Sequence, residues 1–492
     1  MFPELTLPKG YNPYDWQVRA FRKFVDDRLD GFALLADVGT GKTAEAILLL
    51  RYIALNHQNP RVLVIGPSVV IHNWASEIKK FSVSKDELGK VYPLADAKKR
   101  RATMQELARL KMPGVAITNY ESFDNEEFTN AVAKWATQVI VCDELHRIKS
   151  PKSKRAKNIV KLSERAAFRL GLTGSAILNS PMDLFMQWKF IDRGESLGTN
   201  FFNFRNRFFF DANARWAGKP NYFPKWEPIK ERFEELAQKI ERSSIRVVKS
   251  ETLDLPPYIE ETMLLEMSPK QRRMYDQMQK DFIAFLDAGP GDKPPAVVAQ
   301  LALTKALRLM QIASGFATID GTGEEVSFGD NPKLDALEKI VEDNPQEKII
   351  VWCSFKANYR VIAERLDKIG VKYVMLTGEQ NAQEKQASID AFQTDPEVRV
   401  VVANRKAGGI GVNLTAGSIS CVFSRNFSLE EEIQSDGRNY RGGSQIHSKI
   451  TKINLTMANS IEEKIIEALA SKQNISKLII DRDFVRPIEL IA

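Results

Sequence analysis

Two short segments carry residues whose types and spacing suit the transfer of a phosphoryl group. In FALLADVGTGKTAEAILLL, a strand-like apolar run leads through a glycine-containing turn into a helix-like run. Backbone N–H groups at the start of such a helix bind phosphates, and Lys42 is expected to reach the β- and γ-phosphate oxygens. Thr43 is expected to place its hydroxyl on Mg²⁺. The segment Gly39-Thr40-Gly41-Lys42-Thr43 therefore predicts a site for ATP and Mg²⁺.

A second segment, VIVCDELH, supplies the carboxylates that hydrolysis needs. At the end of this buried strand, Asp143 is expected to hold the Mg²⁺ shell and Glu144 to polarise the attacking water. Simpler alternatives exist for both segments. The glycines could form a plain turn that caps a helix, since the strict phosphate-loop pattern fails at its first position, Ala36, and the acids could cap the next helix. The presence of both segments in one chain favours the catalytic interpretation.

Two arginines lie far along the chain, in QSDGRNYRGGSQ, a segment made mostly of glycine and small polar residues. Phosphoryl transfer needs positive charge on the developing transition state, and an arginine from another element is a common source of that charge. Arg438 and Arg441 are therefore expected to reach the γ-phosphate from a second lobe. A solvated surface pair, or one that bridges to Asp436, is the alternative.

The elements that must position these groups form two similar sets. Continuous apolar runs separated by helical stretches indicate parallel sheets that are buried on both faces. We therefore predict an α/β fold with two RecA-like parallel-sheet lobes and a mainly helical insertion between them. The predicted domains are lobe 1 (1–190), the insertion (191–330), lobe 2 (331–458) and a C-terminal helix (459–492). The expected strands are 32–36, 61–66, 114–119, 138–144 and 168–174 in the first lobe, and 348–354, 372–378, 398–404, 418–424 and 449–455 in the second.

Composition narrows the class of protein. With 492 residues, 43% of them hydrophobic and 27% charged, the chain is expected to fold as more than one soluble domain. Its net charge of +7 leans toward a polyanionic partner. Neither a signal peptide nor a membrane-spanning run is evident, so we expect an intracellular protein, most simply a monomer. Cys142, Cys353 and Cys421 are far apart in apolar runs and are expected to be core thiols rather than metal ligands.

The motifs together resemble helicase superfamily two, and more narrowly the Swi/Snf-type ATP-dependent DNA translocases, over nearly the whole chain. The segments similar to family motifs are YDWQVRAF (14–21), IHNWASEIKKF (71–81), DELHRIKSPKSK (143–154), GLTGSAILNSPMDLF (171–185), ANRKAGGIGVNLTAG (403–417), QSDGRNYRGGSQ (434–445) and SIEEKIIEALASKQ (460–473). The resemblance implies that Gln17 contacts adenine, that Ser68 and Asn73 contact one nucleic-acid strand, and that SIEEKIIEALASKQ forms a brace helix.

Two departures from the family pattern stand out. The third motif usually contains Thr-Gly-Thr-Pro, where this chain has Thr173-Gly174-Ser175-Ala176. An acidic residue that the family often carries is replaced around Ser424 and Arg425. The change in the third motif removes no catalytic group.

The resemblance also implies a nucleic-acid partner, most simply double-stranded or branched DNA, held through phosphate contacts. Segment 146–163 has seven basic residues and no acidic residue, and it forms either a DNA contact or a solvated helix face. Its candidate contacts are Arg147, Lys149, Lys152 and Lys154, and those of the glycine-rich turn further on are Asn413 and Thr415. The aromatic segment 201–210 is expected to pack against a lobe rather than to separate strands.

The predicted function is an ATP-dependent translocase on double-stranded DNA, which moves on or remodels duplex or branched DNA. Two alternatives stay open. One is a strand-separating DNA or RNA helicase with the same ATPase, and the other is a catalytically silent scaffold that binds nucleic acid.

Overall fold

The structure is a computed structural model that describes residues 5–57, 60–84, 87–218, 222, 224–287, 295–319, 323–405 and 412–481. Part of the predicted motif at 403–417, and the predicted C-terminal segment after residue 481, lie outside the described residues. The chain divides into two compact units. Unit 1 comprises Met1–Arg215, Pro224–Leu253 and Lys472–Ala492, and unit 2 comprises Trp216–Phe223 and Asp254–Ser471.

Unit 1 is built on a seven-stranded sheet in the order β3-β4-β2-β5-β6-β1-β9, in which all neighbouring strands are parallel. Apolar residues of β1 face both sides of this sheet, so both faces are buried under helices. The strands are β1 (Gly31–Ala36), β2 (Arg61–Gly66), β3 (Val91–Pro93), β4 (Gly114–Asn119), β5 (Val139–Asp143), β6 (Phe168–Thr173) and β9 (Ser244–Val247).

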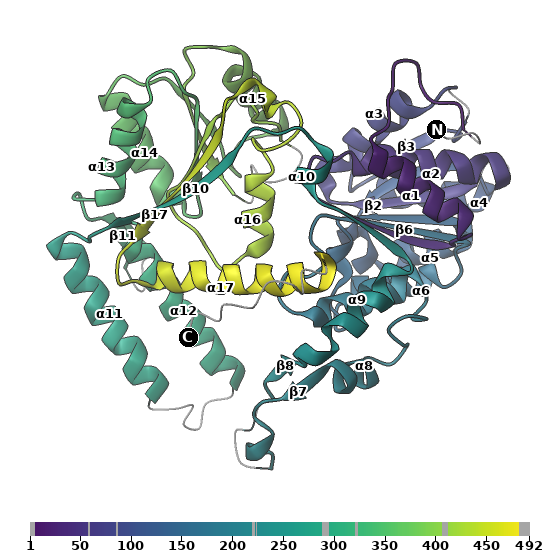
Figure 1. The fold of residues 1–492 in the computed structure, drawn as a ribbon, viewed down its shortest axis with the longest axis horizontal. Helices are drawn as coiled ribbons and strands as arrows, with labels where there is room; N and C mark the ends of the chain where they lie inside the picture. The colour runs from purple at the N-terminus through teal and green to yellow at the C-terminus, as the bar shows by residue number, and fades with distance from the viewer. Residues whose placement is uncertain are drawn as a thin grey trace. The chain divides into compact units, whose positions relative to one another are not determined.

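Two groups of helices cover the sheet of unit 1 (Figure 1). One face packs against α1 (Asp15–Asp26), α2 (Lys42–His57) and α3 (Ile71–Phe81). The other packs against α4 (Arg100–Leu110), α5 (Glu126–Trp135), α6 (Lys154–Ser163) and α7 (Leu184–Ile191). A small extension follows, with α8 (Phe201–Phe208), the antiparallel strands β7 (Phe209–Asp211) and β8 (Trp226–Pro228), and α9 (Phe233–Glu241).

Unit 2 contains a six-stranded sheet in the order β10-β17-β16-β13-β15-β14, again with parallel neighbours throughout. Its strands are β10 (Tyr258–Leu265), β13 (Ile349–Cys353), β14 (Tyr373–Leu376), β15 (Val400–Asn404), β16 (Ile419–Val422) and β17 (Ile450–Met457). Helices α13 (Pro332–Asp343) and α14 (Lys356–Lys368) cover one face, and α15 (Ala382–Thr394) covers the other.

Further helices of unit 2 lie beside this sheet. The helices α11 (Pro269–Asp287) and α12 (Pro295–Ala313) contact each other, and α12 leads into the hairpin β11 (Phe316–Thr318) and β12 (Glu325–Ser327). Helix α16 (Leu429–Asp436) precedes the two candidate arginines. Helix α17 (Ile461–Ser476) follows β17, and its residues from Lys472 onward belong to unit 1.

The predicted fold class is confirmed, and all ten predicted strand runs coincide with strands of the two sheets. Residues 191–330 contain more than helices, however. Strand β9 pairs with β1 at the edge of the first sheet, and β10 pairs with β17 at the edge of the second. The boundary between the compact units falls at residues 253–254, inside the predicted insertion, whereas the four predicted domains stay a prediction. Among the described residues, no helix has both the length and the apolar character that crossing a membrane requires.

Candidate nucleotide-binding site

The turn between β1 and α2 has the backbone shape of a phosphate-binding loop. Gly39 and Gly41 have φ angles of +89° and +91°, a left-handed conformation that glycine adopts without strain. Thr40 is buried, and its hydroxyl donates to the carbonyl oxygen of Asp37 at 2.8 Å. Trp16 of α1 donates from Nε1 to the carbonyl oxygen of Thr40 at 3.2 Å. The turn is therefore held from inside and from the neighbouring helix, with the N-terminus of α2 directly after it.

Lys42 begins α2 and lies close to the carboxylates of the site. Its Nζ donates to the carbonyl oxygens of Ala36, at 2.6 Å, and Asp37, at 3.0 Å. Burial lowers the pKa of Lys42, and Glu144 and Asp143 act in the opposite direction by favouring the charged form. Thr43 follows in the first turn of α2. The structure thus brings Lys42 together with both acids predicted at the end of β5.

Asp143 is held in place by a residue to which the sequence analysis gave no role. Trp74 of α3 donates from Nε1 to Oδ2 of Asp143 at 2.8 Å. Burial, followed by repulsion from Glu144, raises the pKa of Asp143 to about 6, while the Trp74 hydrogen bond and Lys42 pull it down. The hydrogen bond from Trp74 thus fixes the orientation of the Asp143 carboxylate. Carboxylate oxygen is a ligand that Mg²⁺ prefers, and such sites complete the Mg²⁺ shell with substrate phosphates and water.

Glu144 has a left-handed backbone with φ of +58°, which is uncommon for a residue other than glycine. Tyr120 stabilises this turn, because its hydroxyl donates to the carbonyl oxygen of Asp143 at 2.7 Å. Strained backbone of this kind often marks a functional site. The short helix Leu145–Ile148 begins directly after Glu144.

His146 connects Glu144 to the end of β6. Its Nδ1 lies 3.4 Å from Oε2 of Glu144 and 3.0 Å from Oγ1 of Thr173. The same Thr173 oxygen accepts a hydrogen bond from the backbone N–H of Ser175 at 3.1 Å. His146 therefore links Thr173, at the end of β6, to Glu144, which follows β5.

Gln17 lies beside the phosphate loop, and its predicted contact with the base stays a prediction. It is fully buried, and its Nε2 donates to the carbonyl oxygen of Gly41 at 3.3 Å. Its Oε1 accepts hydrogen bonds from the Tyr11 hydroxyl at 2.7 Å and from the Tyr14 N–H at 2.9 Å. Both tyrosines precede the helix and were not singled out in the sequence.

Arg246, which the sequence analysis did not identify, contacts the other side of the phosphate loop. Arg246 of β9 donates from Nη1 to Oδ1 of Asp37 at 2.8 Å and to the carbonyl oxygen of Leu35 at 3.1 Å. The N–H of Lys249 donates to Oδ2 of Asp37 at 3.0 Å. These residues come more than 200 positions after the loop, so no local pattern could have indicated them.

The two candidate arginines belong to unit 2. Arg438 is buried, with its Nη1 3.5 Å from the carbonyl oxygen of Val412. Arg441 is half-buried, and burial lowers its pKa. No hydrogen bond or ion pair to the Arg441 guanidinium is found among the described residues. Its proposed contact with a nucleotide stays a prediction.

Buried charges fix the helix that leads to these arginines. Lys452 of β17 contacts Glu432 of α16 at 2.7 Å and Asp436 at 2.9 Å, and Arg405 also pairs with Glu432. These cations hold the pKa of Glu432 well below its usual range although burial opposes them. The segment that carries Arg438 and Arg441 therefore begins on a rigid, charge-paired support.

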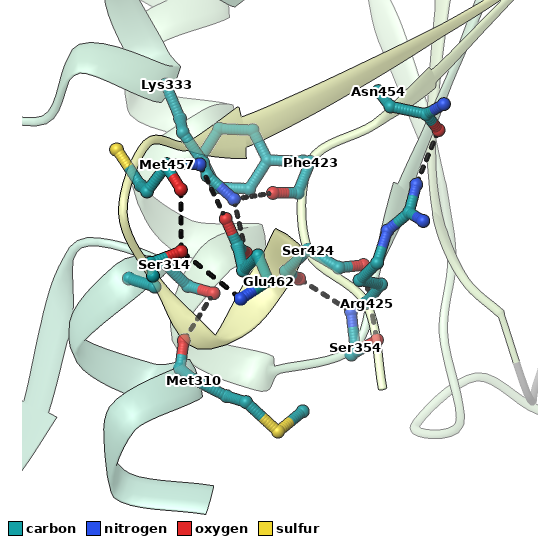
Figure 2. A network of polar contacts seen from close by, with 12 residues as sticks. Met310, Ser314, Lys333, Ser354, Phe423, Ser424, Arg425, Asn454, Met457 and Glu462 are labelled. Atoms are coloured by element: carbon teal, nitrogen blue, oxygen red, sulfur yellow. Dashed lines mark hydrogen bonds and ion pairs between the residues drawn. The ribbon is translucent and has the colours of Figure 1, made fainter. Parts of the chain in front are cut away.

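A second buried ion pair in unit 2 joins the first turn of α13 to the first turn of α17. Figure 2 shows Lys333 pointing at Glu462, with Nζ 2.6 Å from Oε1, and at the carbonyl oxygen of Phe423, 2.9 Å away. Ser424 and Arg425, which replace the family's acidic residue, are also engaged. The Ser424 hydroxyl accepts from the N–H of Ser354 at 2.8 Å, and Arg425 donates to Asn454 at 2.5 Å (Figure 2).

The candidate nucleic-acid contacts fall into an exposed and a buried group. Exposed are Ser68, Asn73, Lys152, Lys154 and Asn413, while Arg147 and Lys149 are half-buried. Lys149 lies 3.8 Å from Asp183. Thr415 is buried, and its hydroxyl accepts from Gln393 at 3.4 Å. The five exposed residues are thus accessible to a phosphate backbone, whereas Thr415 already has a partner within the fold.

Two families of known proteins match this chain. The family described as SNF2-related domain matches residues 22–313, and the helicase conserved C-terminal domain matches residues 332–443. The mouse "SWI/SNF-related matrix-associated actin-dependent regulator of chromatin subfamily A member 1" is 24% identical over 486 residues, which cover 96% of this chain and 44% of that protein. The Arabidopsis thaliana "Protein CHROMATIN REMODELING 5" is 24% identical over 491 residues, which cover 95% of this chain and 27% of that protein. The chain thus spans less than half of either relative.

A solved structure, "Sulfolobus solfataricus SWI2/SNF2 ATPase core in complex with dsDNA", is 24% identical to this chain. The match covers 97% of this chain and 96% of that one, with a TM-score of 0.40.

Proposed function

Because the chain belongs to the family of the SNF2-related domain, we propose that it is an ATP-driven motor that moves along double-stranded DNA. The observation that carries this proposal is the meeting of Lys42, Asp143 and Glu144 beside a glycine turn at one end of the unit 1 sheet. The transfer of a phosphoryl group to water requires a cation that binds the phosphates, a carboxylate that holds Mg²⁺ and a second carboxylate that orients the water.

Each residue of the site has a separate task in this proposal. The N–H groups of Gly39 to Thr43 and the ammonium of Lys42 bind the phosphates, and Gln17 contacts the base. Asp143, with Thr43, would hold Mg²⁺, which neutralises charge on the phosphate oxygens when it is bound. Glu144 orients the attacking water and accepts its proton, and His146 keeps the Glu144 carboxylate aligned.

Unit 2 supplies the remaining positive charge in this proposal. Arg441 is half-buried and has no acidic partner among the described residues, as an arginine reserved for a ligand phosphate should be. Arg438 would act beside it from a more buried position. The paired charges around Glu432 support both by fixing α16.

DNA is proposed to bind through its phosphates to the exposed residues Ser68, Asn73, Lys152, Lys154 and Asn413. Contacts of this kind do not depend on base sequence and weaken with salt. DNA held by both units would favour the arrangement in which Arg441 meets the nucleotide, so hydrolysis should depend on DNA.

The test is ATP turnover with and without blunt duplex DNA, at low and at high salt. The proposal predicts slow turnover alone, strong stimulation by duplex, and loss of the stimulation as salt rises. Equal turnover with and without duplex would contradict it. Displacement of a third strand from a triplex, without unwinding of a forked duplex, would separate translocation from strand separation.

A further inference from the structure

The helix α8 of unit 1 has two faces with different chemistry. Phe204 and Phe208 point into the hydrophobic core, where they are 2% and 3% exposed. This confirms that the aromatic segment packs against the lobe. The opposite face carries Phe202, which is 61% exposed, together with arginine and asparagine side chains. The helix sequence FFNFRNRF contains no acidic residue.

Phe202 is the end of an ordered stack. The guanidinium carbon of Arg205 lies 3.7 Å from the ring centroid of Trp226 and 5.1 Å from that of Phe202. Phe201 meets the Phe202 ring at 66°, with the centroids 6.0 Å apart. Helix α8 and strand β8, which carries Trp226, lie together in unit 1 (Figure 1). The Phe202 ring is thus supported from the protein side while most of its surface faces solvent.

The charge of Arg205 is not neutralised nearby. Among the residues that the structure describes, no carboxylate forms an ion pair with Arg205, and its Nε has no hydrogen-bond partner. Its neighbour Arg207, by contrast, pairs with Glu235 of α9. The exposed Asn203 and Asn206 lie on the same helix and add amide donors and acceptors.

We propose that Phe202, Arg205 and Trp226, which we name the α8 stack, bind unpaired bases of a single-stranded nucleic acid. An exposed aromatic ring next to an unpaired guanidinium offers base stacking and phosphate attraction in one place. The amides of Asn203 and Asn206 can bond to base edges or sugar. Inside a duplex the bases are stacked on each other, so away from duplex ends only unpaired nucleotides of DNA or RNA can stack on the Phe202 ring.

This site goes beyond the proposed function, which needs only the duplex backbone. A second site for unpaired bases on unit 1 would direct the motor to duplexes that carry a single-stranded overhang or branch. Duplex contacts and the α8 stack would then act on two parts of one substrate.

The experiment measures fluorescence anisotropy of labelled oligo-dT, oligo-rU and blunt duplex DNA with the full chain, in the absence of nucleotide. Phe202→Ala removes the ring, Phe202→Leu keeps the apolar character without the ring, and Phe202→Trp restores a stacking surface. Phe210→Ala is the matched control. Phe210 is also an exposed phenylalanine, at 48%. Consecutive residues of a strand point to opposite faces, so Phe210 lies on the face of the β7–β8 hairpin opposite to Trp226.

The expected result is that Phe202→Ala and Phe202→Leu weaken oligo-dT binding about tenfold, the size typical for one stacked base. Phe202→Trp and Phe210→Ala should bind oligo-dT like the unaltered chain, and duplex binding should be the same for all variants. Comparing oligo-dT with oligo-rU tells whether the unpaired strand is DNA or RNA.

Several results would overturn the proposal. The proposal is wrong if the unaltered chain does not bind single strands, or if Phe202→Ala binds oligo-dT as tightly as the unaltered chain does. It is also wrong if Phe210→Ala loses as much oligo-dT affinity as Phe202→Ala, or if Phe202→Ala loses duplex affinity to the same extent. Capture of a protein at this surface without oligonucleotide binding would also overturn it. Oligonucleotide binding is measured without ATP, so it does not depend on whether duplex DNA stimulates ATP hydrolysis. Likewise, a failure of oligo-dT binding would not bear on the stimulation of hydrolysis by duplex DNA.

Discussion

A buried glutamate in the first turn after the phosphate loop should make the stability of unit 1 depend on pH. Glu45 is completely buried in α2, and neither carboxylate oxygen has a hydrogen-bond partner among the described residues. Burial raises the pKa of Glu45 well above its usual value, so the folded chain holds this carboxyl in its neutral form. The unfolded chain releases the proton once the pH exceeds the ordinary glutamate pKa.

The sign of the effect follows from that difference. A raised folded-state pKa means that the folded state binds the proton more tightly, so stability is full at low pH and falls as pH rises. The loss is about 1.4 kcal/mol for each pH unit between the unfolded and folded pKa values. The glutamine in Glu45→Gln has nearly the same shape as glutamate but has no carboxyl proton to release. Its stability relative to the unaltered chain should therefore improve as the pH rises from 5.5 to 7.0.

The assay is urea unfolding at both pH values, followed by tryptophan fluorescence. Five of the seven tryptophans lie in unit 1, so the signal reports mainly on that unit. Glu106→Gln, on the exposed side of α4, is the control and should behave alike at both pH values. A stability gap between Glu45→Gln and the unaltered chain that stays constant with pH would refute this reasoning.

Three further changes test other parts of the structure. Glu144→Gln should lower the rate of ATP hydrolysis about 10²- to 10⁴-fold while nucleotide binding is retained, measured by phosphate release and by equilibrium binding; unchanged hydrolysis would reject Glu144 as the base. Lys452→Met removes the cation that pairs with both Glu432, at 2.7 Å, and Asp436, at 2.9 Å, and should destabilise unit 2 by about 3–5 kcal/mol in denaturant unfolding, whereas an unchanged midpoint would contradict the support role of these pairs. Replacing Lys152 and Lys154 together by glutamine should reduce the slope of log affinity against log salt for duplex DNA by about 2, and an unaltered slope would place the DNA elsewhere.

The sequence predicted the parts of the fold that depend on local patterns. Continuous apolar runs identified ten strands, because a strand that is buried on both faces must be apolar along its length. Strand β10 escaped notice because most of YIEETMLL is exposed, so its sequence lacks that run. Strand β9, with the sequence SIRV, contains a serine and an arginine and therefore also lacks a continuous apolar run.

The residues of the candidate site also divide into those that a local sequence pattern predicts and those that it does not. Lys42, Asp143 and Glu144 were predictable because their chemistry depends on a short motif at a strand end. Trp74 and Arg246 were not, because each contacts the site from a distant part of the chain. The α8 stack was predictable only in part. The sequence marked the aromatic segment, but only the structure separates the buried Phe204 from the exposed Phe202.

The central claim is that a nucleotide bound by unit 1 is completed by Arg441 of unit 2. Its most direct test is the rate of ATP hydrolysis by Arg441→Ala at saturating duplex DNA, with nucleotide affinity measured separately. Arg360→Ala serves as control, since Arg360 is an exposed arginine of the same unit, with 66% of its side chain accessible. The account predicts a loss of about 10³-fold or more in Arg441→Ala, with nucleotide affinity nearly unchanged and Arg360→Ala fully active. Hydrolysis by Arg441→Ala at the rate of the unaltered chain would contradict it.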